Sequence, residues 1–316
     1  MAAKAAFVFP GQGSQGVGMG KALAESFPAA RQVFDEVDAA LGEKLSQIIW
    51  NGPAETLTLT ENAQPALMAV SLAALRALET EAGIDLKRDA AFVAGHSLGE
   101  YSALAAAQSL TISDAARLLR IRGRTMQKAV PVGIGAMAAL IGVELETAKS
   151  IAAEAAAAGV CEAANDNGGG QVVLSGAKVA VERAVDIAKA QGVKRAMMLP
   201  VSAPFHCALM QPAADVMAEA LTNVAVKSPC VPLVANVIAT PIDDPAGIVQ
   251  SLVKQVTSTV RWRESVLFMA QAGVTVFYEV GAGKVLTGLI KRIADAATAS
   301  SIGTPDDIIR FKTAQA

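Results

Sequence analysis

Histidine and cysteine are scarce in this chain of 316 residues, which contains only two histidines and three cysteines. The cysteines, Cys161, Cys207 and Cys230, are odd in number, widely spaced and without a CxxC pair. Such a set favours neither a disulfide framework nor a structural zinc site. We therefore expect a cytoplasmic protein that carries no metal.

Charge and long apolar runs are also limited. Charged residues make up 18% of the chain, hydrophobic residues 53%, and the net charge is −2. This balance disfavours disordered tails and a nucleic-acid-binding surface. The first apolar run stops at Pro10, too soon for a signal peptide, and no later stretch reaches the ~18 uninterrupted apolar residues of a membrane helix. We expect a packed globular enzyme that binds neither nucleic acid nor membrane, and a monomer.

Short apolar runs define the expected architecture. Runs at 5–9, 90–95 and 274–283 end in glycine-rich turns, and each precedes a segment with helical spacing. This alternation predicts an α/β fold with a mostly parallel sheet. Residues 135–201 instead read β-α-β-β-α-β, the ferredoxin-like order. We predict a large α/β domain of residues 1–130 and 203–316 with a small ferredoxin-like domain, 131–202, inserted into it and a ligand-binding cleft between them.

Residues 90–100, AAFVAGHSLGE, contain the pattern G-x-S-x-G centred on Ser97. In a nucleophile elbow, the serine lies on a tight strand-to-helix turn, and small residues on either side let the backbone approach closely. The flanking strand and helix patterns fit this context. The alternative is a tight turn in which Ser97 only caps the helix.

A nucleophilic serine needs a general base, and imidazole has a suitable pKa. His96 adjoins Ser97 and points in a different direction, so His206 is left by elimination. It precedes a helix expected at 208–221, whose N-terminus would keep the ring neutral. A third group would orient the ring. A backbone carbonyl could do so, and the candidate carboxylates are Asp243, Asp244 and Glu279.

One arginine lies on an apolar helix face. At ~100° per residue, Arg122 falls opposite its neighbouring arginines, among leucine and methionine side chains. Those neighbouring arginines are Arg117, Arg120 and Arg124. A buried guanidinium needs an anion or several acceptors, and its planar fork suits a carboxylate. Arg122 is therefore either a clamp for a substrate carboxylate or one half of an internal ion pair.

The segment FVFPGQGSQGVGMG also satisfies G-x-G-x-x-G, with Asp35 or Glu36 at the position expected for ribose binding. One interpretation is therefore a dinucleotide-binding module in which Ser97 plays no part. Pro10 and the glutamines of the turn argue against pyrophosphate contact. A second interpretation is an oxyanion loop that lies against the serine elbow. A third is a turn that needs positive φ.

Six motifs occur in order between about residues 5 and 295. They are FPGQGSQ, GHSLGEYSAL, IRGRTMQ, GAMAALIG, SAPFHCALM and EVGAGKVLTGLIKR. Together they resemble the malonyl-CoA:acyl carrier protein transacylase family. The resemblance implies a hydrolase-like α/β domain with an inserted ferredoxin-like domain, and ping-pong transfer of malonyl from malonyl-CoA to acyl carrier protein for fatty acid synthesis. It implies no cofactor, because the coenzyme A thioester is itself the substrate.

The resemblance also assigns roles. It implies that Ser97 attacks the thioester, His206 moves the proton and Arg122 holds the malonyl carboxylate. The backbone N–H groups of Gln12 and Leu98 would form the oxyanion hole. In this family, a main-chain carbonyl orients the histidine. That carbonyl corresponds to Gln255, so the resemblance sets Asp243 and Asp244 aside.

Three further features follow from the resemblance. Leu98 and Phe205 resemble the malonyl-selective members, and Asn165 and Asn167 match a loop facing the cleft as candidate substrate contacts. Position 259 is threonine here, whereas many relatives have proline. We expect this difference to loosen the loop that carries Gln255. Alternative functions are a loading acyltransferase of a polyketide or malonate decarboxylase system, or a serine esterase or thioesterase that uses water as acceptor.

Overall fold

The computed structural model describes residues 4–201 and 203–315 and contains two β-sheets. The larger sheet has the strand order β10-β9-β1-β2-β7-β8, and all its neighbouring strands are parallel except the β7–β8 pair. Its strands are β1 (Lys4–Phe9), β2 (Phe92–Gly95), β7 (Leu233–Val234), β8 (Pro241–Ile242), β9 (Val274–Val280) and β10 (Thr298–Ile302). The predicted α/β class and mostly parallel sheet are confirmed.

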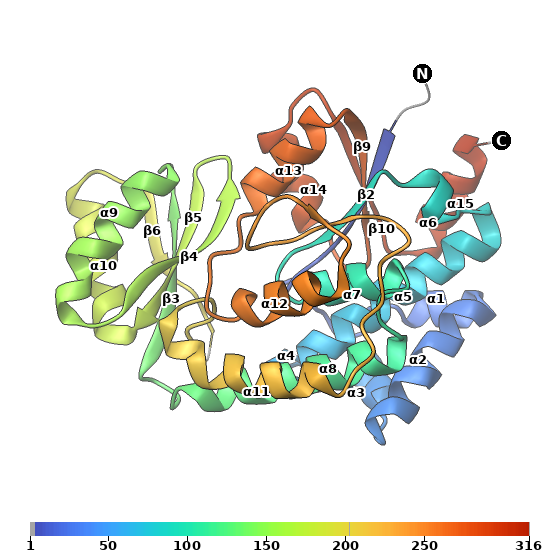
Figure 1. The fold of residues 1–316 in the computed structure, drawn as a ribbon, viewed down its shortest axis with the longest axis horizontal. Coiled ribbons are helices and arrows are strands. Elements are labelled where there is room, and N and C mark those ends of the chain that lie inside the picture. Colours follow the sequence, from blue (N-terminus) through green and yellow to red (C-terminus); the bar gives the residue numbers. More distant parts are fainter. Residues whose placement is uncertain (1–3, 202, 316) are drawn as a thin grey trace.

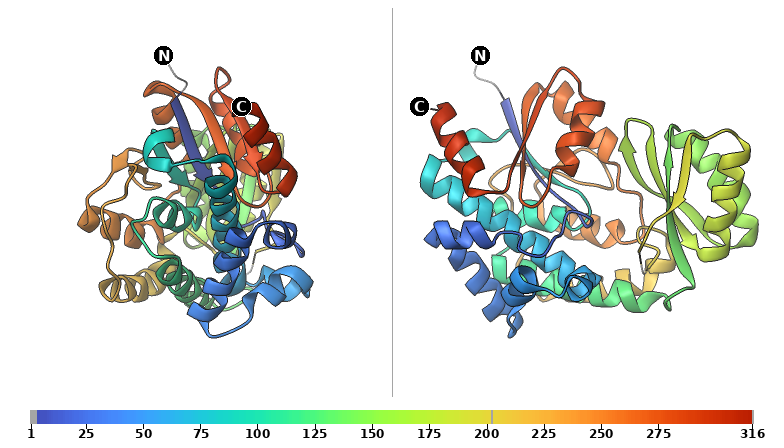
Figure 2. Two further views of the ribbon diagram at one scale, coloured as in Figure 1. Left: turned by 90° about the vertical axis from the view of Figure 1, so that its right-hand side faces the viewer. Right: turned by 180° about the vertical axis from the view of Figure 1, so that it is seen from behind.

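Helices cover both faces of this sheet (Figures 1 and 2). Along β1, the side chains of Phe7 and Phe9 belong to one apolar core, whereas those of Ala6 and Val8 belong to another. This alternation is the two-residue period of a strand buried on both faces. The second core is completed by α13 and α14, and the first by most of the other helices of the large part.

The helices of the large part vary from single turns to one of 23 residues, α5. They are α1 (Lys21–Ser26), α2 (Pro28–Leu41), α3 (Leu45–Asn51), α4 (Ala54–Thr58), α5 (Thr60–Ala82), α6 (Leu86–Asp89), α7 (Gly99–Ala106), α8 (Ile112–Ala129), α11 (Gln211–Thr222), α12 (Pro245–Gln255), α13 (Trp262–Gln271), α14 (Val285–Ile293) and α15 (Pro305–Gln315). Among residues 4–201 and 203–315, no helix combines the length and the apolar character needed to cross a membrane.

The second sheet is antiparallel, with the strand order β4-β5-β3-β6. Its elements are β3 (Gly135–Ile141), α9 (Leu145–Ala155), β4 (Cys161–Gly168), β5 (Gln171–Ala177), α10 (Lys178–Ala190) and β6 (Arg195–Met198). All six were predicted in this order. The sheet packs on α9 and α10 around its own apolar core, and it forms a separate lobe at the left of Figure 1.

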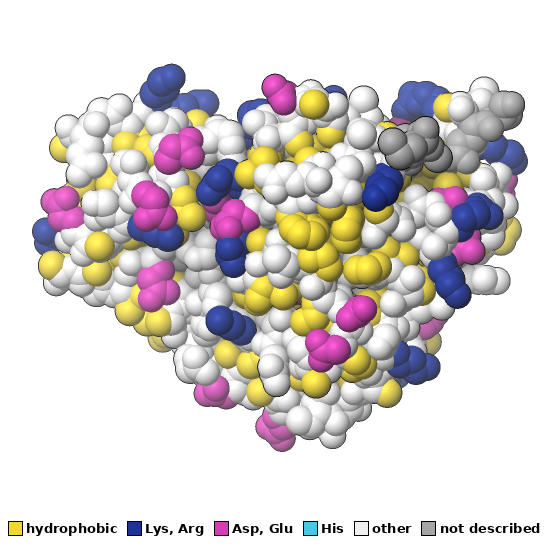
Figure 3. All heavy atoms as spheres, turned by 45° about the horizontal axis from the view of Figure 1, so that its top comes forward, with side chains coloured by type: hydrophobic (Ala, Val, Ile, Leu, Met, Phe, Trp, Pro, Cys, Tyr) yellow, Lys and Arg dark blue, Asp and Glu magenta, His cyan; other side chains and the backbone are white. Residues whose placement is uncertain are grey.

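The segment after α12 joins this lobe to the large part. The Val260 N–H donates to the Ala164 carbonyl at 2.8 Å, and the Thr259 hydroxyl donates to the Ala163 carbonyl at 2.5 Å. The Thr259 hydroxyl thus makes a hydrogen bond to β4 that proline could not make, which argues against the expectation that Thr259 loosens the loop. Figure 3 shows acidic and basic side chains mixed over one face of the molecule, around an apolar area.

Candidate active site

Ser97 lies on a tight turn between β2 and α7, with a φ of 54°. A Cβ atom at Gly95 would come within 1.9 Å of the Gly99 backbone, and one at Gly99 within 2.3 Å of the Phe9 carbonyl oxygen. Real Cβ atoms do not approach backbone so closely, so only glycine fits at these two positions. The predicted strand-to-helix context of the G-x-S-x-G motif is present, and the glycines are required by close backbone packing.

The His206 ring lies beside the serine hydroxyl. Ser97 Oγ is 2.7 Å from His206 Nε2, and His206 Nδ1 is 2.8 Å from the Gln255 carbonyl oxygen. A carbonyl oxygen only accepts hydrogen bonds, so Nδ1 carries the hydrogen and Nε2 is left to accept one from the serine. The geometry therefore links a hydroxyl, an imidazole and a main-chain carbonyl in one chain of hydrogen bonds.

His206 is a neutral imidazole at physiological pH. Burial lowers its pKa to about 3, and the positive charge of Arg122 acts in the same direction. We predicted a neutral ring for a different reason, the N-terminus of a following helix. The regular α-helix α11 begins only at Gln211, after a short 3₁₀ turn, and burial is the leading cause of the shift.

The other histidine is engaged elsewhere. His96 Nε2 lies 2.9 Å from Asn167 Oδ1, and its ring packs near Trp262 with centroids 5.7 Å apart. Burial lowers the pKa of His96 as well. The structure thus brings Asn167 to the elbow through His96, and His206 is the histidine whose ring contacts the Ser97 hydroxyl.

Arg122 reaches the serine from the buried face of α8, as its helical phase predicted. Its side chain is 1% exposed, and Nη2 lies 3.1 Å from Ser97 Oγ. Nη2 also donates to Gln255 Oε1 at 2.8 Å, and Nη1 donates to Gln64 Oε1 at 2.6 Å. The guanidinium is thus held by two neutral amide oxygens beside the serine hydroxyl.

Within the described residues, no Asp or Glu forms an ion pair with Arg122. Its Nε atom is buried without a hydrogen-bond partner in the same part of the chain. Burial lowers the pKa of Arg122, so this site favours an anion that would stabilise the charge. The internal ion pair considered above is therefore not formed among these residues, and the buried carboxyl of Glu100 is joined to Arg122 only through the Gln255 amide. The carboxylate clamp is left as the candidate role of Arg122.

The neighbouring arginines behave differently. Arg120 is also buried, and it pairs with Glu43 and Asn62. Arg124 pairs with Glu61 and Arg117 with Asp114 on the surface. Each of these three has a carboxylate partner of its own, which sets Arg122 apart on the same helix.

The loop after β1 lies against the elbow. A Cβ atom at Gly11 would come within 2.7 Å of the His96 carbonyl oxygen, so the two backbones are in contact. In the described part of the chain, neither the Gln12 N–H nor the Leu98 N–H donates a hydrogen bond to another residue. Leu98 directly precedes α7, so its N–H is among the free donors of that helix N-terminus. This arrangement suits the oxyanion loop of the three interpretations above.

The dinucleotide interpretation fails on topology. Its acidic residue should follow the second strand of a βαβ unit. Glu36 instead lies within α2, where its carboxylate accepts hydrogen bonds from the Ser113 N–H at 3.2 Å and hydroxyl at 2.8 Å. The next strand after the glycine loop is β2, which ends at the serine elbow.

The remaining predicted residues are candidate substrate contacts and candidate carboxylates for orienting the His206 ring. Phe205 is 9% exposed and packs in the main core next to His206, and Asn165 lies on β4, where its backbone bridges Val260. Two of the candidate orienting carboxylates have other partners. Asp244 caps α12, and Glu279 accepts hydrogen bonds from the Leu286 and Thr287 N–H groups at the start of α14. The position beside His206 belongs to the Gln255 carbonyl.

Sequence reasoning missed three buried polar residues around Ser97, namely Gln64, Glu100 and Asn236. Gln64 lies in the apolar helix α5 and Glu100 in the first turn of the apolar helix α7. Burial raises the pKa of Glu100 to about 7. A polar side chain inside an apolar helix was the available signal for these two, whereas Asn236 follows the two-residue strand β7, which the sequence pattern does not reveal.

On an α/β fold, a serine at a strand-to-helix turn in contact with a neutral imidazole is the arrangement of serine-dependent acyl-transfer enzymes. The comparisons with known proteins specify this class further. Residues 6–308 match the family model described as an acyl transferase domain.

The chain is 48% identical over 300 residues to the malonyl CoA-acyl carrier protein transacylase of Escherichia coli K12, covering 95% of this chain and 96% of that protein. It is 57% identical to the acyl-carrier-protein S-malonyltransferase of Bartonella henselae, with a TM-score of 0.95 over 97% of this chain and 98% of that one. A malonyl-transacylase solved with a type II polyketide acyl carrier protein is 42% identical, with a TM-score of 0.94 over 98% of this chain and 99% of that one. The chain belongs to the malonyl-CoA:acyl carrier protein transacylase family.

Proposed function

We propose that the protein transfers the malonyl group of malonyl-CoA to the phosphopantetheine thiol of acyl carrier protein, through an ester on Ser97, and so supplies fatty acid synthesis. The observation that carries this proposal is the buried guanidinium of Arg122, which lies 3.1 Å from Ser97 Oγ and forms no ion pair with a carboxylate of the described residues. A site that only cleaved neutral acyl groups would gain nothing from a buried cation at that place. A malonyl group has a free carboxylate for it to bind.

The proposed first half-reaction forms the ester. Ser97 Oγ attacks the thioester carbon while its proton passes to His206 Nε2, 2.7 Å away. The carbon–sulfur bond then breaks, and His206 returns the proton to the leaving coenzyme A thiolate. The Gln255 carbonyl, which holds Nδ1–H at 2.8 Å, keeps the ring in the tautomer that this step requires.

The second half-reaction runs the same steps with a different thiol. The carrier thiol gives its proton to His206, its sulfur attacks the ester carbon, and the released Ser97 oxygen takes the proton back. The Gln12 and Leu98 N–H groups are proposed to bind the oxyanion of both tetrahedral intermediates, supported by their lack of other hydrogen bonds among the described residues. Serine and histidine supply nucleophile and base, so we propose that the reaction needs no cofactor.

Selectivity for malonyl is assigned to Arg122, with Gln64 and Gln255 holding its guanidinium. In the ester, the carboxylate lies two bonds beyond the acyl carbon, within reach of a guanidinium that already contacts Ser97 Oγ. Leu98 and Phe205, both buried beside the serine and histidine, are proposed to shape the acyl pocket, and Asn165 and Asn167 to contact the substrate.

The small lobe is proposed to be a ferredoxin-like domain of residues 131–202 inserted between residues 1–130 and 203–316. The order β4-β5-β3-β6, with α9 and α10 each following one strand of the pair β3 and β5, supports this proposal. The free thiols of Cys161, Cys207 and Cys230 are in keeping with the further proposal of a cytoplasmic enzyme.

A two-step labelling experiment tests the function. Malonyl-CoA carrying a labelled malonyl group should leave the label on the peptide that contains Ser97, and addition of holo acyl carrier protein should move it to the carrier thiol. Because the acceptor of the proposed second half-reaction is the carrier thiol and not water, little malonate should be released. Label on another peptide, or release of malonate at the rate at which label leaves the enzyme, would identify a different function, the latter a thioesterase.

The low pKa of His206 predicts an unusual pH profile. A free imidazole with a pKa of ~6.5 would lose its function as a base below neutral pH, whereas one with a pKa of about 3 remains unprotonated at pH 5. We therefore expect kcat/KM for malonyl-CoA, which reports on the free enzyme, to show no titration of His206 near pH 6.5 between pH 8 and pH 5. Because the pKa of Glu100 is raised to about 7, Glu100→Gln is the control: a halving of kcat/KM near pH 6.5 that persists in this variant would contradict the low pKa of His206.

The same shift has a consequence for stability. Below the unfolded pKa of ~6.5, the unfolded imidazole binds a proton that the folded one does not, so His206 lowers the free energy of unfolding as the pH falls from 6.5 toward 3. His96, whose pKa is also lowered, acts in the same direction. Glu100, whose pKa is raised to about 7, acts in the opposite direction, so the measurement is urea unfolding at pH 7 and pH 5 of the wild type against His206→Ala, in which only the His206 contribution is removed.

A further inference from the structure

The backbone of Ser97 is held in a conformation that few residues adopt. Its φ of 54° places a residue with a Cβ in the left-handed region, which costs on the order of 1–3 kcal/mol unless the surroundings enforce it. The hydrogen-bonded pairing of β2 with β7 does not extend to Ser97. Strand β2 pairs with β7 through Val93 and Ala94 only, and both strands end there or one residue later.

The Asn236 side chain continues this pairing beyond the strands. Its Oδ1 accepts a hydrogen bond from the Ser97 N–H at 2.8 Å, and its Nδ2 donates to the Gly95 carbonyl oxygen at 2.6 Å. One amide group thus satisfies both a donor and an acceptor of the elbow, two residues apart, as the next residue of a strand would. Asn236 is fully buried, so no water replaces these bonds.

Several contacts fix Asn236 itself. Its backbone N–H donates to Glu100 Oε2 at 3.2 Å, and the same carboxyl oxygen accepts from Gln255 Nε2 at 2.7 Å. Gln255 Nε2 also lies 2.9 Å from the Ser97 carbonyl oxygen. Glu100 therefore connects the two amide side chains that hold the N–H and the carbonyl of Ser97.

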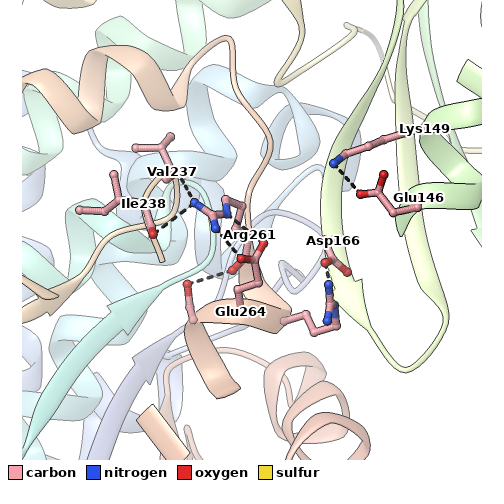
Figure 4. A network of polar contacts seen from close by, with 9 residues as sticks. Glu146, Lys149, Asp166, Val237, Ile238, Arg261 and Glu264 are labelled. Atoms are coloured by element: carbon pink, nitrogen blue, oxygen red, sulfur yellow. Dashed lines mark hydrogen bonds and ion pairs between the residues drawn. The ribbon is translucent and has the colours of Figure 1, made fainter. Parts of the chain in front are cut away.

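The chain after Asn236 is fixed from the other side. The Arg261 N–H donates to the Asn236 carbonyl at 3.0 Å, and the Arg261 side chain donates to the Val237 and Ile238 carbonyls at 3.2 Å (Figure 4). Glu264 holds that guanidinium in turn. Asn236 is thus anchored at its N–H by α7 and at its carbonyl by the start of α13.

We propose that Asn236 is a positioning residue for the nucleophile, whose amide holds the strained elbow so that Ser97 Oγ meets His206 Nε2 and the following N–H faces the oxyanion. This inference extends the proposed function, since it concerns the same serine. The argument is geometric. If the Ser97 N–H and Gly95 carbonyl lost their partner, each peptide beside His96 would keep one backbone hydrogen bond, from the His96 N–H to the Phe9 carbonyl at 3.0 Å and from the Gly99 N–H to the His96 carbonyl at 2.9 Å. Each peptide could then tilt about that bond, and Ser97 Oγ and the Leu98 N–H would move with them.

The test uses full-length Asn236→Ala and Asn236→Asp variants and a probe that does not depend on the acyl substrate. A serine-directed fluorophosphonate reacts when Ser97 Oγ forms a bond to phosphorus, fluoride leaves and His206 takes the proton. We expect Asn236→Ala to lower the rate constant of this reaction and the kcat of malonyl transfer on the order of 100-fold, as small misplacements of reacting groups do. KM for malonyl-CoA should change little, because Arg122 is retained.

Asn236→Asp separates positioning from simple loss of packing. Its carboxyl can accept from the Ser97 N–H in either protonation state, but only the protonated acid can donate to the Gly95 carbonyl. The variant should therefore regain reactivity with the probe as the pH falls from 8 to 5. The wild type, in which Glu100 also titrates while His206 and Arg122 keep their charge states, is the reference profile.

Asp38→Ala is the matched control for stability. Asp38 lies on α2 and is also buried. Its carboxylate accepts hydrogen bonds from the Ser46 N–H at 2.9 Å and from the Ser46 hydroxyl at 2.7 Å. The Asp38→Ala substitution should lower Tm without slowing the probe reaction of the folded enzyme. Wild-type reactivity in Asn236→Ala, or a loss in Asn236→Asp that does not recover at low pH, would overturn the proposal. A wild type that reacts with the probe but fails to transfer malonyl would instead refute the proposed function alone.

Discussion

Ser97→Ala should abolish the acyl-enzyme and lower malonyl transfer on the order of 10⁴- to 10⁶-fold, the loss seen when a catalytic serine is removed. The physical reason is that, among residues 4–201 and 203–315, only the Ser97 hydroxyl contacts both His206 Nε2, at 2.7 Å, and Arg122 Nη2, at 3.1 Å. His206→Ala should cost a similar amount, because the hydroxyl then has no base. The double variant should be scarcely worse than either single one, since the two residues act as a unit.

Ser102→Ala is the control for this prediction. Ser102 lies on α7 only five positions further on, is also buried, and its Oγ has no hydrogen-bond partner among the described residues. Removing that hydroxyl should leave transfer unchanged. Mass spectrometry of the intact protein after mixing with malonyl-CoA measures the ester directly. An ester that still forms on Ser97→Ala would show that a different residue is the nucleophile.

Arg122→Ala should change which acyl group the enzyme prefers. Removing one partner of a buried charge pair costs about 2–5 kcal/mol, so malonyl transfer should fall on the order of 100- to 1000-fold. Acetyl transfer should fall much less, because an acetyl group has no carboxylate for the guanidinium to bind. Part of the loss will be common to both, since Gln64 and Gln255 lose the donor that their side-chain oxygens accept from.

Arg120→Ala is the matched control two residues earlier on the same helix. Arg120 is also buried, but it pairs with Glu43 and lies on the side away from Arg122. Its removal should destabilise the protein without changing the ratio of malonyl to acetyl transfer. The measurement is kcat/KM for both coenzyme A esters in each variant. Equal losses for the two esters in Arg122→Ala would contradict a role as carboxylate clamp.

Much of the fold could be predicted because its signals are local. The apolar runs at 5–9 and 90–95 are β1 and β2, and all six elements between Gly135 and Met198 occur as predicted. The short strands β7 and β8 and the last strand β10 were not predicted. Strands of two residues carry no periodic pattern, and their place in the sheet depends on neighbours far along the chain.

Some site residues could be predicted from the sequence and others could not, because only some of them carry a local signal. Ser97 could be found from its own glycines, His206 by elimination between two histidines, and Arg122 from its phase on one helix. The role of the Gln255 carbonyl came only from family resemblance, because every residue has a carbonyl and no pattern singles one out. Asn236 was missed, since an asparagine after a short strand resembles an ordinary turn residue.

The amino-acid sequence by itself determined the strand-to-helix turn, the helix face of Arg122 and the scarcity of alternative bases, because each is a property of one short segment. Only the tertiary structure decided what these groups do together. Ser97 and His206 are 109 positions apart, and the Gln255 side chain reaches the Ser97 carbonyl across 158 positions. Such contacts depend on how the whole sheet and its helices pack. The burial that holds His206 neutral and surrounds the Arg122 guanidinium with amide oxygens exists only once that packing is complete.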